Sequence, residues 1–388
     1  MLGNDPNRDL RFDSVRGLML VFMTVNHLPS SWRVLTDQSV GICTAAEGFV
    51  FLSGLLAGMV YTRKRRKLGA AELHVATRRR TNTIYWWHVG SFLAALGAVQ
   101  LTGAVCGFCS NTAPQLFYSH PLWAIGLGST LLYQPGMLDI LPLYCCLVAI
   151  LPFVLTALET GRRGLLLAVS FGLWLAVQGS PPIDGAPLYP IHVGTFNLFA
   201  WQFLFILGVV IGHDRVSNPR PQLTIRYGLI AGAAAIAVFG WGIRHMQWRA
   251  PWPLRLYGIS LNKPSLGFLR LADFAAVAYL LAIIGSVWPR LLRWPPLAFL
   301  GQHSLAVVAV QSVAGIVILQ FPGLFTTTAR DWATTGFSVA LLFAAAAAHL
   351  AWQRRNRTER RGDPSAGPIR TRQAVALPLS PADDVRAA

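Results

Sequence analysis

The sequence is short of charged side chains. Asp, Glu, Lys and Arg make up 13% of its 388 residues, about half the fraction that is usual in soluble domains. Hydrophobic residues reach 54%, and the mean hydropathy is +0.47. Among the charged residues, the acidic ones are fewer, with 16 against 33 lysines and arginines. This composition excludes an ordinary soluble domain and indicates a chain that lies mostly in lipid.

Other features are missing as well. No segment alternates apolar and polar residues with a period of two, which argues against an outer-membrane barrel. The first apolar run lacks a small-residue cleavage site and is interrupted by Arg16 and His27, so we expect it to remain as the first span. We find no internal repeat. The five cysteines form no metal framework, although Cys106 and Cys109 allow a local disulfide. We therefore expect no metal site.

Long apolar runs recur along most of the chain. They predict an all-α, polytopic transmembrane bundle of about ten spans, near residues 14–32, 43–61, 82–104, 136–158, 164–179, 195–212, 227–243, 269–288, 296–320 and 335–352. The net charge of +17 falls mainly in alternate loops, as the positive-inside rule requires, rather than in a nucleic-acid-binding patch. Both termini are then cytoplasmic. We expect a membrane-embedded domain over 1–352 and a basic, disordered cytoplasmic tail over 353–388.

The first predicted span contains two ionisable residues that a membrane helix should exclude. Arg16 and His27 are eleven residues apart, so they share one stripe of a helix and lie ~16 Å apart along its axis. Such residues mark a functional site by default. The near-neutral pKa of an unperturbed histidine suits a general base, although a neighbouring helix could equally satisfy His27. A buried arginine needs an anion, and both Asp13 and a phosphorylated ligand from the cytoplasm fit that need.

The second predicted span begins with an acid. Glu47 lies at a depth comparable to His27 if the two spans are antiparallel, so its carboxylate could orient the imidazole. Ser53, deeper in the span, either donates to a ligand or bonds back to its own helix. We expect the basic segment 63–80 to be a loop; it suits phosphates of a soluble cofactor or anionic lipid, and it ends in Arg78, Arg79 and Arg80.

More polar residues lie at helix ends or within spans than lipid-facing helices would tolerate. They imply a polar cavity inside the bundle, although each alone is readily structural; they are Asp139, Tyr144, Asn197, Trp201, Gln202, Lys263, Arg270, Asp273, Gln302 and His303. Two GxxxG spacings, Gly54–Gly58 and Gly208–Gly212, predict close helix packing rather than chemistry.

These residues carry a resemblance to a known family. Arg16 and His27 resemble the Arg-x10-His signature of the integral-membrane acyltransferase-3 superfamily. EGFVFLSGLL at 47–56 is similar to its acidic-x-Phe-Phe-x-x-Ser-Gly segment, with Glu47 where Asp is usual and the aromatic pair split. More narrowly, the chain resembles the OpgC branch, associated with succinylation of osmoregulated periplasmic glucans, in RFDSVRGL, NH at 26–27, LDILPLY, FNLFAWQ, NKPSLGFLRL and LGQHSL.

The resemblance implies an O-acyltransferase of the bacterial inner membrane. Cytosolic acyl-CoA, succinyl-CoA or acetyl-CoA, would be the donor and a periplasmic glucan or other glycan the acceptor. His27 would be the catalytic base, Arg16 would bind acyl-CoA or support the site, and Glu47 would assist. Other motif residues are candidates for substrate contact or scaffolding: Asp13, Asn26, Asp139, Tyr144, Asn197, Trp201, Gln202, Lys263 and His303. The alternatives are a multipass transporter or flippase and a non-catalytic membrane scaffold.

Overall fold

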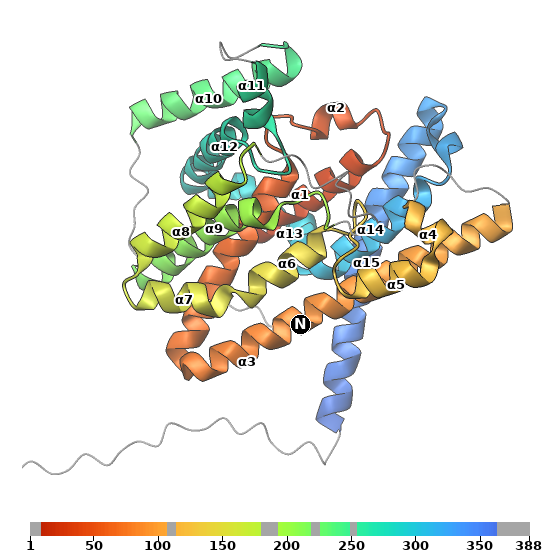
Figure 1. The fold of residues 1–388 in the computed structure, drawn as a ribbon, viewed down its shortest axis with the longest axis horizontal. Helices are drawn as coiled ribbons and strands as arrows, with labels where there is room; N and C mark the ends of the chain where they lie inside the picture. Colours follow the sequence, from red (N-terminus) through yellow and green to blue (C-terminus); the bar gives the residue numbers. More distant parts are fainter. Residues whose placement is uncertain (1–8, 107–113, 180–192, 219–225, 249–253, 363–388) are drawn as a thin grey trace, which may run out of the picture. The chain divides into compact units, whose positions relative to one another are not determined.

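Every apolar segment predicted to span a membrane coincides with at least one helix. The computed structural model describes residues 9–106, 114–179, 193–218, 226–248 and 254–362, and within these ranges all regular secondary structure is helical (Figure 1). The first part of the chain forms α1 (Leu10–His27), α2 (Arg33–Thr36), α3 (Ala45–Cys106), α4 (Gln115–Ser119), α5 (Pro121–Ser129), α6 (Ile140–Ala149), α7 (Leu151–Glu159) and α8 (Arg163–Ala176). The second part forms α9 (Leu198–Ser217), α10 (Tyr227–His245), α11 (Leu254–Leu261), α12 (Phe268–Val287), η1 (Pro289–Leu292), α13 (Pro295–Gln302), α14 (Ser304–Ile318), η2 (Pro322–Phe325) and α15 (Thr328–Gly362).

Among the described residues, six helices are long and apolar enough to cross a membrane. The number becomes seven if α13 and α14, which meet at an angle of 85°, are counted as one broken span. Helix α1 is not among the six, and it carries Arg11, Asp13 and Arg16 within its 18 residues. The described part of the chain is thus all-helical, with several membrane-spanning candidates, while the count of ten spans and the cytoplasmic location of both termini stay predictions.

Helix α3 contains two of the predicted spans. Its two legs meet at Gly69, whose backbone (φ 88°, ψ 176°) departs from helical geometry. Glycine adopts this positive φ without a steric penalty, so it allows a sharp turn between the legs (Figure 1). The basic segment 63–80, which we expected to be a loop, is therefore helical on both sides of the turn.

The predicted close packing at the GxxxG pairs is confirmed, because α3 and α9 approach each other through these glycines. A Cβ atom on Gly54 would lie 2.2 Å from the carbonyl oxygen of Phe205, and one on Gly58 would lie 2.4 Å from that of Val209. The approach is reciprocal: Cβ atoms on Gly208 and Gly212 would clash with carbonyl oxygens of α3. Only glycine leaves room for the two backbones at this crossing.

Helix α1 packs on α13 in the same way. A Cβ atom on Gly17 would meet the carbonyl oxygen of Leu297, and one on Gly301 would meet that of Asp13. The interior beside α1 is filled by large side chains from several helices, with Leu20, Trp201 and Phe205 fully buried. This packing fixes the axis of the helix that carries Arg16 and His27.

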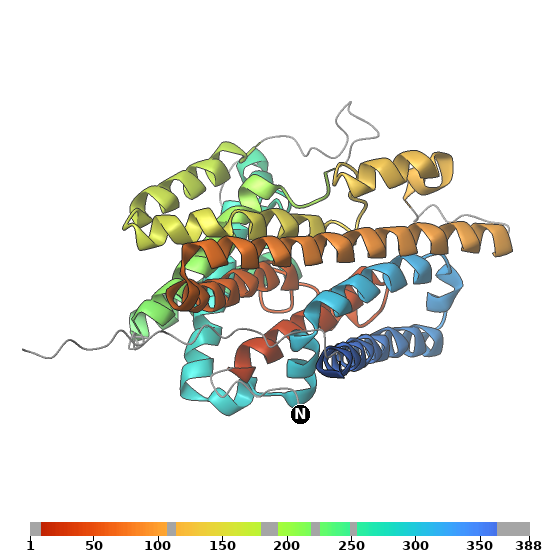
Figure 2. The ribbon, with the colours of Figure 1, turned by 90° about the horizontal axis from the view of Figure 1, so that it is seen from below.

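A second apolar cluster joins the other leg of α3 to the segment after it. Phe92 of α3 packs on Phe117 of α4, with ring centroids 5.2 Å apart. Figure 2 shows α4 and α5 in gold along one side of this leg, and α14 in light blue along the other. Helices α4 and α5 thus lie between two of the predicted spans, while Cys109 lies outside the described residues.

The chain forms two compact units, Met1–Ala346 and Ala347–Ala388. The second contains the end of α15, which continues to Gly362, so the first residues of the predicted tail over 353–388 are helical. Residues 363–388 lie outside the described ranges.

Candidate functional site

His27 is the last residue of α1. The backbone becomes extended at Leu28 (φ −98°, ψ 149°), which ends the helix. The side chain of His27 is exposed at this helix end. The charges of Lys263 and Arg33 both act on this ring, so two cations lie within electrostatic reach of it. An imidazole with exposed surface can accept a proton from a bound hydroxyl.

Arg16 lies three turns earlier on the same helix and joins three helices. Its Nη2 donates to Oγ of Ser304 at 2.8 Å, at the start of α14. Its guanidinium carbon lies 5.2 Å from the centre of the Phe49 ring in α3, a cation–π contact. Arg16 therefore holds α1 in place, in keeping with the supporting role that the sequence left open beside donor binding.

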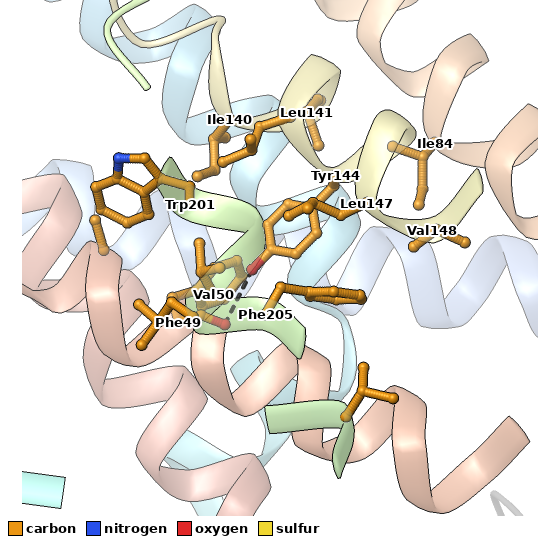
Figure 3. Packing of buried hydrophobic residues seen from close by; sticks show 14 of the residues in the cluster. Phe49, Val50, Ile84, Ile140, Leu141, Tyr144, Leu147, Val148, Trp201 and Phe205 are labelled. Carbon is orange, nitrogen blue, oxygen red and sulfur yellow. Dashed lines mark hydrogen bonds between the residues drawn. The ribbon is translucent and has the colours of Figure 1, made fainter. Parts of the chain in front are cut away.

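Tyr144 and Ser53 belong to the same cluster as Arg16. The Tyr144 ring meets the Phe49 ring edge to face, with centroids 5.7 Å apart. Its hydroxyl donates to the carbonyl oxygen of Phe49 at 2.9 Å, and it is also hydrogen-bonded to Oγ of Ser53 at 2.9 Å. Figure 3 shows Tyr144 directed at the Phe49 carbonyl among buried apolar residues. The sequence candidates Arg16, Ser53 and Tyr144 are thus brought together.

Glu47 makes contacts other than the expected one. Its Oε2 accepts hydrogen bonds from the backbone nitrogen (2.9 Å) and hydroxyl (2.6 Å) of Thr44, and its Oε1 lies 3.0 Å from Nε of Arg270. Thr44 directly precedes α3, so the Glu47 carboxylate makes the half of a capping box that bonds back to the backbone nitrogen before the helix. In the described part of the chain, no hydrogen bond joins Glu47 to His27. The catalytic assistance assigned to Glu47 stays a prediction, and its observed contacts are structural.

Arg270 and Asp273 extend this buried network along α12. Oδ2 of Asp273 accepts from the backbone nitrogens of Ile42 (2.7 Å) and Cys43 (2.9 Å), while Nη1 of Arg270 donates to the carbonyl oxygen of Ile42 at 2.6 Å. Both side chains are almost completely buried. Their opposite charges and these hydrogen bonds to the backbone offset part of the cost of that burial. The network fixes the segment that joins the end of α1 to α3.

Asn197, Trp201 and Gln202 have scaffolding contacts. Asn197 caps α9 by accepting from the backbone nitrogen of Phe199 at 3.0 Å. Trp201 is fully buried, and its indole nitrogen donates to the carbonyl oxygen of Pro264 at 3.0 Å. Gln202 exchanges hydrogen bonds with Ser170 of α8 at 2.7 and 2.8 Å. These three motif residues therefore secure α9 and the loop that carries Lys263.

Lys263 and Asp139 lie near one another beside the end of α1. The charge of Lys263 acts on the Asp139 carboxyl, which accepts a hydrogen bond from the backbone nitrogen of Thr195 at 3.1 Å. Nζ of Lys263 lies 5.8 Å from the centre of the Phe196 ring. Asn26, next to His27, donates to the carbonyl oxygen of Thr36 at 3.2 Å and so ties down the segment after α1.

The remaining candidates lie apart from this cluster or at helix junctions. Asp13 is buried where α1 meets α13, and His303 is buried at the bend between α13 and α14, with its ring 5.1 Å from that of Phe299. Arg78, Arg79 and Arg80 are exposed on α3 beyond the turn at Gly69.

Part of the basic segment is engaged within the protein. Arg65 donates to Oγ1 of Thr156 at 2.8 Å, and Arg66 donates to Oγ of Ser217 at 2.6 Å. These contacts join α3 to α7 and α9, which reduces the number of cations that a soluble cofactor would meet.

The described residues contain no group of three or more His, Cys, Asp or Glu side chains arranged to hold a metal ion.

The family comparison gives a positive result: the family model described as OpgC protein matches residues 8–358. The chain belongs to the OpgC family. The match covers most of the chain and, with the long apolar helices, indicates a membrane protein of the glucan-modifying acyltransferase type. No curated protein and no solved structure matches this OpgC chain.

Proposed function

We propose that this OpgC-family protein is an O-acyltransferase of the bacterial inner membrane. It moves an acyl group, succinyl in preference to acetyl, from cytosolic acyl-CoA to a hydroxyl of a periplasmic glucan. The observation that carries the proposal is the place of His27, whose exposed imidazole ends α1 next to two cations in a chain of this family. The exposed imidazole and the membership of this family both suit acyl transfer between two substrates that meet at the end of α1.

In the proposed reaction, His27 accepts the proton of the acceptor hydroxyl. The hydroxyl oxygen attacks the thioester carbonyl carbon, a new C–O bond forms, and the C–S bond breaks. The CoA thiolate leaves and takes up a proton, so the products are an ester on the glucan and free CoA. Arg16 keeps α1 aligned through Ser304 and Phe49, so that the imidazole stays at a constant position.

Exposed Arg78, Arg79 and Arg80 are suited to the donor's phosphates, because guanidinium groups pair readily with phosphate oxygens. This assignment depends on α3 turning back at Gly69 on the cytoplasmic side, as the positive-inside rule predicts.

The test uses the full-length protein in liposomes that enclose glucan and receive acyl-CoA from outside. Mass spectrometry should find acyl esters on the enclosed glucan, and none with liposomes that lack the protein. Absence of esters from a folded, correctly inserted protein would contradict the proposal. Appearance of unreacted donor inside the liposomes would favour the transporter alternative instead.

A further inference from the structure

The loop over residues 262–267 joins α11 to α12 and has one charged side chain, that of Lys263. Oδ1 of Asn262 accepts hydrogen bonds from the backbone nitrogen and the hydroxyl of Ser265, at 2.9 and 2.8 Å. The backbone nitrogen of Gly267 donates to the carbonyl oxygen of Asn262 at 2.8 Å. The loop is thus closed on itself through its first residue.

Side chains from α8 and α9, and from just beyond α8, hold this loop from outside. The carbonyl oxygens of residues 264–266 each accept a hydrogen bond: Trp201, Gln178 and Trp174 donate to them in that order, at 3.0, 2.8 and 2.9 Å. Three consecutive carbonyls with buried or half-buried donors leave the backbone little freedom to move. The position from which Lys263 extends is therefore fixed by the fold.

Lys263 is half-buried, and among the described residues no carboxylate lies within ion-pair distance of its ammonium group. The other cations near the end of α1 have partners. Arg270 pairs with Glu47, and Arg33 lies 3.6 Å from Asp37. An ammonium group partly withdrawn from water is stabilised by a bound anion. Among the cations near the end of α1, Lys263 is thus best able to bind an anion.

Helix α6 shows that Lys263 and Arg16 lie at different levels of the bundle. Tyr144 of α6 packs on Phe49, which Arg16 covers, whereas the charge of Lys263 acts on Asp139, directly before α6. Five residues of helix correspond to roughly 7.5 Å. Along α1, His27 follows Arg16 toward the helix end. A donor that enters from the level of Arg16 would therefore present its carbonyl to His27 and the far end of its acyl group to Lys263.

We propose that Lys263 binds the free carboxylate of a dicarboxylic acyl group and thereby makes the enzyme prefer succinyl-CoA to acetyl-CoA. The proposal rests on the proposed acyltransferase function. No covalent bond of Lys263 changes; its ammonium group donates hydrogen bonds to the carboxylate while the transfer takes place at the other end of the acyl group. A neutral acetyl group would leave this cation without an anion.

The test compares donors with full-length protein in liposomes. Lys263→Gln should reduce the ratio of kcat/KM for succinyl-CoA to that for acetyl-CoA by about tenfold or more, the loss typical of a hydrogen bond to a charged group. Lys263→Arg, which keeps the charge, should retain most of the preference. Arg290→Gln serves as the matched control, because Arg290 is exposed in η1 and belongs to no part of the site.

Succinamyl-CoA, whose terminal group is a neutral amide of similar shape, provides a test that needs no variant. The wild-type protein should use it about tenfold or more less efficiently than succinyl-CoA. Lys263→Gln should discriminate far less between these two donors, because the charge that separates them has lost its partner.

The outcomes separate the two proposals. Equal losses for succinyl-CoA and acetyl-CoA in Lys263→Gln, or no preference for succinyl-CoA over succinamyl-CoA in the wild type, would overturn the assignment of Lys263 and leave acyl transfer standing. No transfer from any donor by folded wild-type protein would overturn the acyltransferase function itself.

Discussion

Nε of Arg270 lies 3.0 Å from Oε1 of Glu47, and the two side chains are 3% and 0% exposed. They come from α12 and from the first turn of α3, more than 200 positions apart in the chain. The pair therefore joins α12, the helix after the Lys263 loop, to the start of α3. The ion pair is thus a structural support of the candidate site.

Removing the charge of Glu47 should destabilise the fold. Glu47→Gln keeps an oxygen that can accept from Thr44 but leaves the Arg270 charge buried without its partner, which should cost about 3 kcal/mol or more. Thermal unfolding in detergent measures this loss. Glu72→Gln, at an exposed position of α3, is the control and should change stability by less than about 0.5 kcal/mol.

A different result would restore the role that the sequence suggested for Glu47. If Glu47→Gln unfolds at the same temperature as the wild type but loses acyl transfer, its carboxylate acts on His27 in a state that differs from this structure.

Local sequence signals predicted much of the fold. Apolar runs located the long helices, and the glycines at 54, 58, 208 and 212 predicted close helix packing, because both are properties of short segments; that the two glycine pairs meet each other is seen only in the structure. The Thr44-x-x-Glu47 capping box was equally visible in the sequence, but the depth of Glu47 in an assumed span led to its interpretation as a partner of His27. The three-residue spacing between Thr44 and Glu47 was the sequence signal for this contact.

The long-range polar contacts could not be predicted in the same way. The pairing of Asp273 with the backbone of Ile42 and Cys43 depends on how α12 meets a segment some 230 residues earlier. No periodicity carries that information. The helical conformation on both sides of Gly69 was also missed, because a run of basic residues resembles a solvated loop although lysine and arginine are good helix formers.

Two glycines of α3 give a matched comparison: Gly54 lies at the crossing with α9, and Gly97 has open space beside it. Gly54→Ala places a methyl group 2.2 Å from the Phe205 carbonyl oxygen, so it should lower stability by about 1–3 kcal/mol. Gly97→Ala, with no atom within 4 Å of the new methyl group, should raise stability by about 0.5–1 kcal/mol. Thermal unfolding of both variants in the same detergent checks the prediction. Equal effects would show that the two helices do not meet at Gly54.

Ser304→Ala tests whether Arg16 positions α1. The variant removes a hydrogen bond to a guanidinium, which costs about 1.5–3 kcal/mol of stabilisation. If Arg16 serves to align His27, kcat should fall by about tenfold or more while KM for acyl-CoA changes little, since small misplacements of a base are costly. Ser286→Ala, exposed on α12, is the control. A raised KM with an unchanged kcat would instead identify Arg16 as a donor-binding residue.

His27→Gln should slow acyl transfer strongly without loss of stability. The imidazole is exposed at the end of α1, so its replacement removes little packing, whereas loss of a general base lowers the rate by about 10²–10⁴-fold. Initial rates of ester formation in liposomes, together with unfolding temperatures, measure the two effects separately. His245→Gln, exposed at the end of α10, controls for removal of an imidazole elsewhere. Rates equal to the wild type in His27→Gln would mean that the acceptor hydroxyl loses its proton to another group, and the proposed mechanism would be wrong.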